Sequence, residues 1–141
     1  MERVVVDTNV LVAALLRRSG TNRAVIRACL EGKAVPLFGQ ALISEYEDVI
    51  SRDELFRKCS LTRKERWELV AAMASAGEWV QVYYSWTPNL SDEADNHLIE
   101  LAVAGGAGMI VTNNRRDFVQ AELRFPGIRV VSPGEMLRSL R

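Results

Sequence analysis

Acidic side chains recur along this chain where a strand-like run ends or a predicted helix begins. Asp7 ends the β-branched run 4–6, and Asp117 follows a later strand-like run. Glu45 lies in the first half of one predicted helix, and Asp95 lies near the start of another. Carboxylates that converge on one pocket repel unless cations neutralise them, and hard oxygen ligands suit Mg²⁺ or Mn²⁺. Such a site could activate water for metal-assisted phosphodiester hydrolysis.

Most of these acids also have an ordinary structural interpretation. Asp92 could be the N-cap of its helix, and Asp95 could complement the helix dipole from the first turn. Glu45 flanks the apolar stripe of its helix, but Glu47 flanks the other side equally well, so helical periodicity does not choose between them. Asp117 could be a surface residue of a turn.

Asp7 is the hardest acid to explain by structure alone. An unpaired charge inside a buried strand costs several kcal/mol, so we expect Asp7 where the strand emerges. In open α/β sheets that carboxyl edge is where ligands bind.

The elements that would position the acids alternate between strand-like and helical runs, which is typical of a parallel α/β sheet. Strands are predicted at 4–6, 35–38, 79–83, 109–112 and 128–131. Helices are predicted at about 9–17, 22–31, 63–77 and 92–104, with another helix over the apolar positions from 42 to 50, a short helix from 113 and a last one after 132. No linker or repeat interrupts residues 1–141, so we expect one compact domain.

Composition narrows the classes of function. The formal net charge is zero, which argues against a purely electrostatic nucleic-acid binder. The cations are nevertheless mostly arginine, whose planar fork suits phosphate, and local patches such as Arg115 and Arg116 could exist. No apolar run approaches the ~20 residues that span a bilayer, and we expect a cytoplasmic protein without a leader or membrane contact. Cys29 and Cys59 are expected to be reduced structural thiols.

Four segments in order resemble the motif blocks of PIN-domain proteins. The first is Val4–Leu11, which carries Asp7, Thr8 and Asn9 after the valine run. The other three segments are 43–52, 92–98 and 110–118. The resemblance therefore spans the chain.

The resemblance implies a three-layer fold, with a central parallel sheet flanked by helices, and a Mg²⁺- or Mn²⁺-dependent nuclease site that usually acts on RNA. Its metal-binding and catalytic acids would be Asp7, Glu45 and Asp95. Many family members place the fourth acid where this chain has Asn114, and others place it one helical turn later, as Asp117 stands here. We therefore expect Asp117 to be the fourth catalytic and metal-binding residue, with one or two metals.

Supporting roles follow from the same resemblance. Thr8 and Asn9 match the small polar residues after the first acid and would orient Asp7, as Thr112 would. Asp92 matches an acid often found three residues before the third, Asn114 would support the site, and the arginines at 115 and 116 would hold the RNA strand.

Two further expectations concern residues outside the acids. His97 is offset from Asp95 by roughly 200° of helix, so we expect it to point away from the acids and to be neither ligand nor base. Trp67, Trp79 and Trp86 are expected to lie in the core or at a subunit interface.

The leading hypothesis is an endoribonuclease that cleaves single-stranded RNA. The resemblance implies that it is the toxin of a toxin–antitoxin pair, a homodimer silenced by a small antitoxin. The alternative is a PIN-fold scaffold with a weakened site that binds RNA or a protein without cutting. A receiver or aspartyl-phosphate phosphatase is a poor match, because no lysine follows Lys64 and Asn9 replaces the phosphatase's second aspartate.

Overall fold

A parallel five-stranded sheet organises the part of the chain that the structure describes. The computed structural model describes residues 1–17, 20–83 and 96–140. The strand order is β3-β2-β1-β4-β5, and every pair of neighbours is parallel. The strands are β1 (Arg3–Val6), β2 (Val35–Phe38), β3 (Glu78–Trp79), β4 (Met109–Val111) and β5 (Arg129–Val131).

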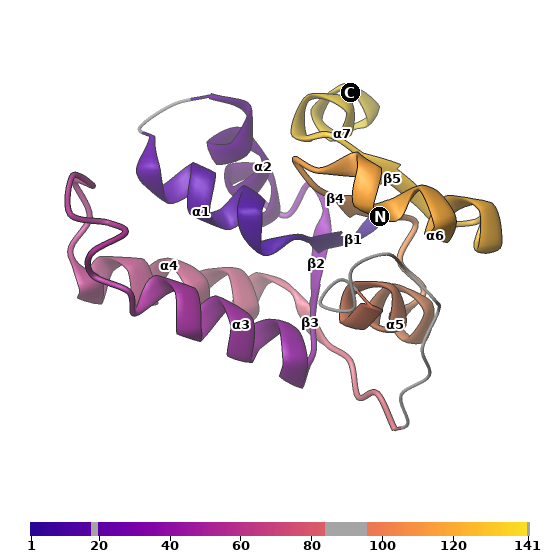
Figure 1. Ribbon diagram of the computed structural model, residues 1–141, viewed down its shortest axis with the longest axis horizontal. Coiled ribbons are helices and arrows are strands. Elements are labelled where there is room, and N and C mark those ends of the chain that lie inside the picture. The colour runs from indigo at the N-terminus through magenta and orange to yellow at the C-terminus, as the bar shows by residue number, and fades with distance from the viewer. Residues whose placement is uncertain (18–19, 84–95, 141) are drawn as a thin grey trace.

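Helices cover both faces of this sheet. They are α1 (Thr8–Leu16), α2 (Thr21–Leu30), α3 (Gln40–Ile50), α4 (Arg63–Ala76), α5 (Asn96–Gly105), the 3₁₀ helix η2 (Arg115–Phe118), α6 (Val119–Arg124) and α7 (Pro133–Ser139). Figure 1 shows α1 to α4 on one side of the strands and α5 and α6 on the other. The predicted three-layer α/β fold is therefore confirmed. No helix in the described ranges is both long and apolar enough to span a bilayer.

The central strands are buried because helices cover them on both faces. Val4, Val5 and Val6 of β1 are at most 1% exposed, and all three residues of β4 are fully buried. Continuous apolar runs of this kind are typical of parallel sheets. A charged residue directly after such a run must lie at the edge of the sheet.

Two of the helix starts, those of α4 and α7, follow the local sequence signals closely. Thr62 and Glu65 form a capping box at α4, and Ser132 and Glu135 form another at α7, with Pro133 in its first turn. In each box the cap hydroxyl accepts from a backbone N–H, and the glutamate accepts from the cap N–H. Both ends are satisfied locally, which is why the sequence predicts them.

The third strand is shorter than predicted. Only Glu78 and Trp79 pair with β2, and the last backbone contact is from Val80 N–H to the Phe38 carbonyl at 2.7 Å. The alternation from Trp79 to Tyr83 reflects a partly exposed chain, since these two residues are 54% and 87% exposed.

Two of the tryptophans lie outside the core, so only the subunit-interface part of their prediction stays open. Trp67 and Trp79 are exposed by 36% and 54% and do not belong to the core. Apolar composition does not fix burial, because the surface of a folded protein is itself largely apolar. Trp86 lies outside the described residues, and a role at a subunit interface stays a prediction.

The chain changes direction across the sheet at β1. From β1 it moves to β2 and β3 on one side, and later to β4 and β5 on the other. The carboxyl ends of β1 and β4 therefore form the switch point, where α/β folds commonly bind ligands.

Candidate active site

Asp7 lies at this switch point, beside Thr112. Val6 and Val111 are register partners in β1 and β4, so the residues that follow each strand are adjacent. Thr112 Oγ1 donates to Asp7 Oδ2 at 2.7 Å, and Asn9 Nδ2 donates to the same oxygen at 3.2 Å. Asp7 is 7% exposed and Thr112 is fully buried. The first predicted acid is thus buried and oriented by hydrogen bonds.

Glu45 is brought to Asp7 by the way α3 is anchored on β1. Tyr46, the neighbouring residue in α3, is 1% exposed and its hydroxyl donates to the carbonyl of Val6, directly before Asp7. This contact holds the first half of α3 against the end of β1. Glu47, which periodicity could not distinguish from Glu45, is exposed.

His97 faces this site, contrary to the sequence-based expectation. Its Nε2 lies 2.7 Å from Glu45 Oε2. The prediction was wrong because an angular offset from Asp95 describes positions on one helix only. It does not say how α5 packs against α3, and this packing carries His97 to Glu45.

The two carboxyl groups have different electrostatic surroundings. Burial raises the pKa of Asp7, and the nearby charge of Glu45 raises it further, against the opposing hydrogen bond from Thr112. The hydrogen bond with His97 lowers the pKa of Glu45, against partial burial. The two carboxylates repel each other when both are ionised, and Asp7 is buried. A bound cation would therefore stabilise their ionised forms.

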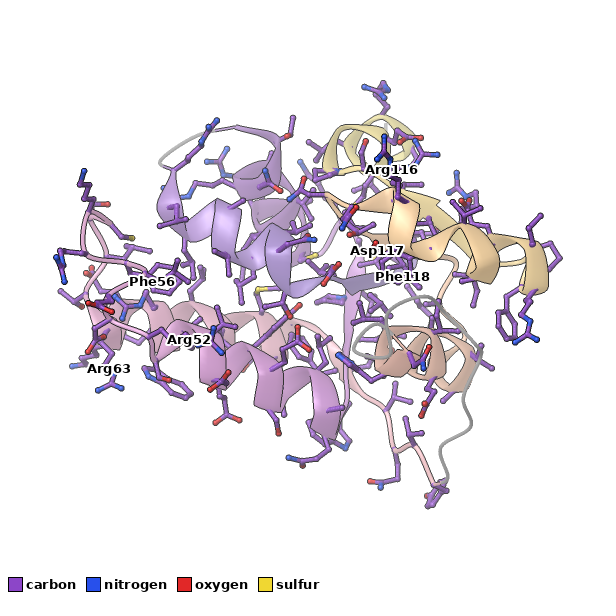
Figure 2. The ribbon with its side chains drawn as sticks, viewed as in Figure 1. Arg52, Phe56, Arg63, Arg116, Asp117 and Phe118 are labelled. Carbon is purple, nitrogen blue, oxygen red and sulfur yellow. The ribbon has the colours of Figure 1, made fainter. Side chains whose placement is uncertain are left out.

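The loop after β4 adds a second group of polar side chains. Asn114 N–H donates to Thr112 Oγ1 at 3.0 Å, and Asn114 Nδ2 donates to Asp117 Oδ2 at 2.7 Å. A hydrogen-bonded path therefore runs from Asp117 through Asn114 and Thr112 to Asp7. Asp117 is partly exposed, while Phe118 beside it is fully buried and anchors the turn (Figure 2).

Amide side chains that the sequence did not single out border this path. Asn113 N–H donates to Asn9 Oδ1 at 3.2 Å, and Asn113 Nδ2 donates to Asn22 Oδ1 at 2.8 Å. These contacts tie the β4 loop to α1 and α2. No spacing rule could have found them, because the residues are about a hundred positions apart in the chain.

The two predicted RNA-binding arginines differ in their contacts. Arg115 Nη1 lies 2.8 Å from Glu135 Oε1, so its charge is paired with the first turn of α7. Arg116 is exposed, and its guanidinium has no hydrogen bond or ion pair with another described residue. Figure 2 labels Arg116 next to Asp117, on the surface of the same turn.

The residues present fit a hard metal ion only in part. Asp7 and Glu45 supply oxygen ligands, and Thr8 Oγ1 is buried without a hydrogen-bond partner among the described residues. Thr8 also lowers the pKa of Glu45, so its hydroxyl lies near this carboxylate. Within the described ranges no three His, Cys, Asp or Glu side chains form a metal-binding group. Asp92 and Asp95 lie outside those ranges, so the predicted set is only partly described.

Comparison with solved structures supports the fold. One match is a chain from the crystal structure of VapBC2 from Rickettsia felis, bound to a DNA fragment from their promoter. The TM-score is 0.59, the identity is 14%, and the match covers 92% of this chain and 98% of the other. At this identity the likeness concerns the fold. A search of the curated proteins found no match.

Comparison with protein families is more direct. A family model described as a PIN domain matches residues 3–116, which includes β1 to β4 and the segments that carry Asp7, Glu45 and Asn114. PIN domains are generally nucleases, and they typically use divalent metal ions. Because the match covers most of the chain and the fold agrees with it, the chain belongs to the PIN-domain family.

Proposed function

We propose that this protein is a metal-dependent endoribonuclease that hydrolyses phosphodiester bonds in single-stranded RNA. The observation that carries the proposal is the buried Asp7 at the switch point, with the charge of Glu45 beside it. Placing two acids together at a buried edge is unfavourable without a cation. A PIN domain with this pair is best explained as a nuclease that requires a metal.

The chain's own residues would either hold the metal ion or orient the residues that hold it. Asp7 and Glu45 would hold Mg²⁺ or Mn²⁺, with Asp95 and Asp117 completing the set. The bound ion would activate water and stabilise negative charge on the phosphate. Thr112 and Asn9 orient Asp7, His97 positions Glu45, and the partly exposed Asp117 is held by Asn114.

Arg116 is the better candidate for holding the RNA strand. Its guanidinium is exposed and has no acidic partner among the described residues, whereas Arg115 already pairs with Glu135. Arginine can contact a phosphate through two parallel hydrogen bonds. We therefore assign the larger share of substrate binding to Arg116.

The proposal includes a biological setting. Many small prokaryotic PIN proteins are toxins of toxin–antitoxin pairs, and the structural likeness to VapBC2 agrees with such a role here. We propose a small antitoxin partner, a homodimer and a cytoplasmic location. The neighbouring open reading frame and sedimentation of the purified protein would test the first two.

The decisive experiment compares labelled single-stranded RNA incubated with the protein in Mn²⁺ or in EDTA, beside Glu45→Gln and Glu47→Gln. These two variants change neighbouring acids on one helix, of which only Glu45 faces Asp7. We expect cleavage that requires metal, is lost in Glu45→Gln and survives in Glu47→Gln. Binding of RNA without cleavage, together with no measurable Mn²⁺ binding by calorimetry, would instead support a scaffold with a weakened site.

A further inference from the structure

A cavity lies next to the acidic site, between α3, β3 and α5. Its volume is about 290 Å³, just below the roughly 300–1,000 Å³ typical of small-molecule pockets. Figure 1 places β3, the start of α3 and α5 next to one another. The polar and aromatic lining residues are Gln40, Ser44, Trp79, Gln81, His97 and Glu100. A cavity of this size suits one planar group rather than a polymer.

The lining combines an aromatic ring with hydrogen-bonding groups. Trp79 is 54% exposed although it lines the cavity, so its indole is accessible to a ligand. Gln40 Nε2 donates to Ser44 Oγ at 3.1 Å, and the amide of Gln81 is exposed. The wall behind them is apolar and includes Leu42 and Leu101, which are nearly fully buried.

This chemistry selects a base over a phosphate. None of the described lining residues is an arginine or lysine, and the Glu100 carboxylate would repel an anion. A nucleobase is flat, stacks on aromatic rings and carries donors and acceptors along its edge. The cavity has an aromatic ring on which a base could stack and polar side chains that could bind its edge.

The cavity is joined to the acidic site through His97. This side chain lines the cavity, and its Nε2 lies 2.7 Å from Glu45 Oε2. Ser44, another lining residue, directly precedes Glu45 in α3. A group bound in the cavity would therefore lie one side chain away from the acids.

We propose that this cavity binds one nucleobase of the RNA strand, next to the phosphate that the acidic site cleaves. The proposal rests on the proposed ribonuclease function and adds a base-binding subsite to it. Trp79 stacks on the base, and the amides of Gln40 and Gln81 contact its edge.

The test measures RNA binding without cleavage. A fluorescein-labelled oligoribonucleotide is titrated with Asp7→Asn protein in EDTA, and anisotropy reports the affinity. Adding Trp79→Ala should weaken binding on the order of tenfold, whereas Trp79→Phe should stay within about threefold because it keeps a ring. Trp67→Ala is the matched control, since this tryptophan is also partly exposed but lies on α4 outside the cavity.

Substrates with a single abasic nucleotide make the test specific and do not depend on the folding of a variant. An abasic nucleotide at one particular position should weaken binding about as much as Trp79→Ala does. In the Trp79→Ala protein, the same abasic nucleotide should cause no further loss of affinity. Equal affinity of the Trp79→Ala protein, or equal losses at every abasic position, would overturn the subsite. So would a change in oligomeric state on Trp79→Ala, measured by sedimentation, because the face would then contact a second copy.

The two proposals can fail separately. If wild-type protein with Mn²⁺ cuts RNA and Trp79→Ala changes nothing, the subsite is wrong and the ribonuclease stands. If the wild type never cuts but the Trp79-dependent binding is present, the cavity binds a base and the proposed catalytic function is wrong.

Discussion

Two buried charges, Arg66 and Asp7, are treated in opposite ways by the fold. Arg66 is 3% exposed, and its guanidinium donates to the carbonyls of Ile50 and Leu61 and to Asp53 Oδ1 at 2.7 Å. It also lies over the Phe56 ring, 4.5 Å from the ring centre. The cation is therefore fully partnered, and it ties the end of α3 to α4.

Asp7 is almost equally buried but is less completely partnered. It accepts hydrogen bonds from Thr112 and Asn9, yet a second acid, Glu45, stands beside it. Figure 2 shows the labels around Phe56 and those around Asp117 in separate parts of the molecule. A satisfied buried charge stabilises the fold, whereas in the acid pair only Glu45 has a basic partner, His97, so a cation beside Asp7 would be favoured.

The largest expected effect is the loss of RNA cleavage caused by the substitution Asp7→Asn. The amide can still accept from Thr112, so the fold should persist, but the charge that would hold the metal is lost. We expect RNA cleavage to fall at least about 1,000-fold, which corresponds to roughly 4 kcal/mol of transition-state stabilisation. Full activity in a purified, folded variant would remove Asp7 from the site.

The same variant should stabilise the metal-free protein at neutral pH. Folding raises the pKa of Asp7, so the folded state binds the proton more tightly than the unfolded state. Ionisation of Asp7 therefore costs stability as the pH rises through its folded pKa, and this cost is absent below the ordinary value of 3.8. Thermal melts in EDTA should show a higher Tm for Asp7→Asn near pH 7, with the difference vanishing below that value.

The next largest effect is on stability, at Arg66. Arg66→Leu leaves the Ile50 and Leu61 carbonyls without their donor, and we expect a loss of about 3 kcal/mol in the free energy of unfolding. Urea denaturation would measure it, and Mn²⁺ affinity of the folded protein should be unchanged. Arg63→Ala is the control, because Arg63 is exposed and should cost at most about 0.5 kcal/mol.

A smaller effect is expected at His97, which connects the acid pair to α5. His97→Ala should lower kcat on the order of tenfold, because Glu45 loses the partner that positions it. His97→Gln, which can still donate a hydrogen bond, should recover part of the rate. A loss that appears only in KM, or no rescue by glutamine, would mean that His97 does not position Glu45.

The smallest effect separates the two neighbouring arginines. Arg116→Ala should weaken RNA binding about threefold to tenfold and reduce its salt dependence, because an unpaired guanidinium is free to contact a phosphate. Arg115→Ala should change RNA binding less, since Arg115 already pairs with Glu135. Binding titrations at several salt concentrations would rank them, and the reverse order would contradict the assignment.

The sequence by itself determined most of the elements, apart from the length of β3, and the position of one acid, Asp7. Continuous β-branched runs predict buried parallel strands, and the capping residues Thr62 and Ser132 mark helix starts, because both signals act between neighbours in the chain. Asp7 was predictable for the same reason: a carboxylate directly after a buried run has nowhere to lie except the edge of the sheet.

Asn9 and Thr112 were expected to orient that acid, and they do, but only the tertiary structure decided which other side chains lie near it. Helical spacing does not distinguish Glu45 from Glu47. The hydrogen bond from Tyr46 to Val6 does, because it sets which side of α3 faces β1. Spacing also gave the wrong prediction that His97 points away from the acids, because spacing carries no information on how α5 packs against α3. Side-chain direction within one element follows from periodicity, but contacts between elements depend on their packing angles, which only the folded chain sets.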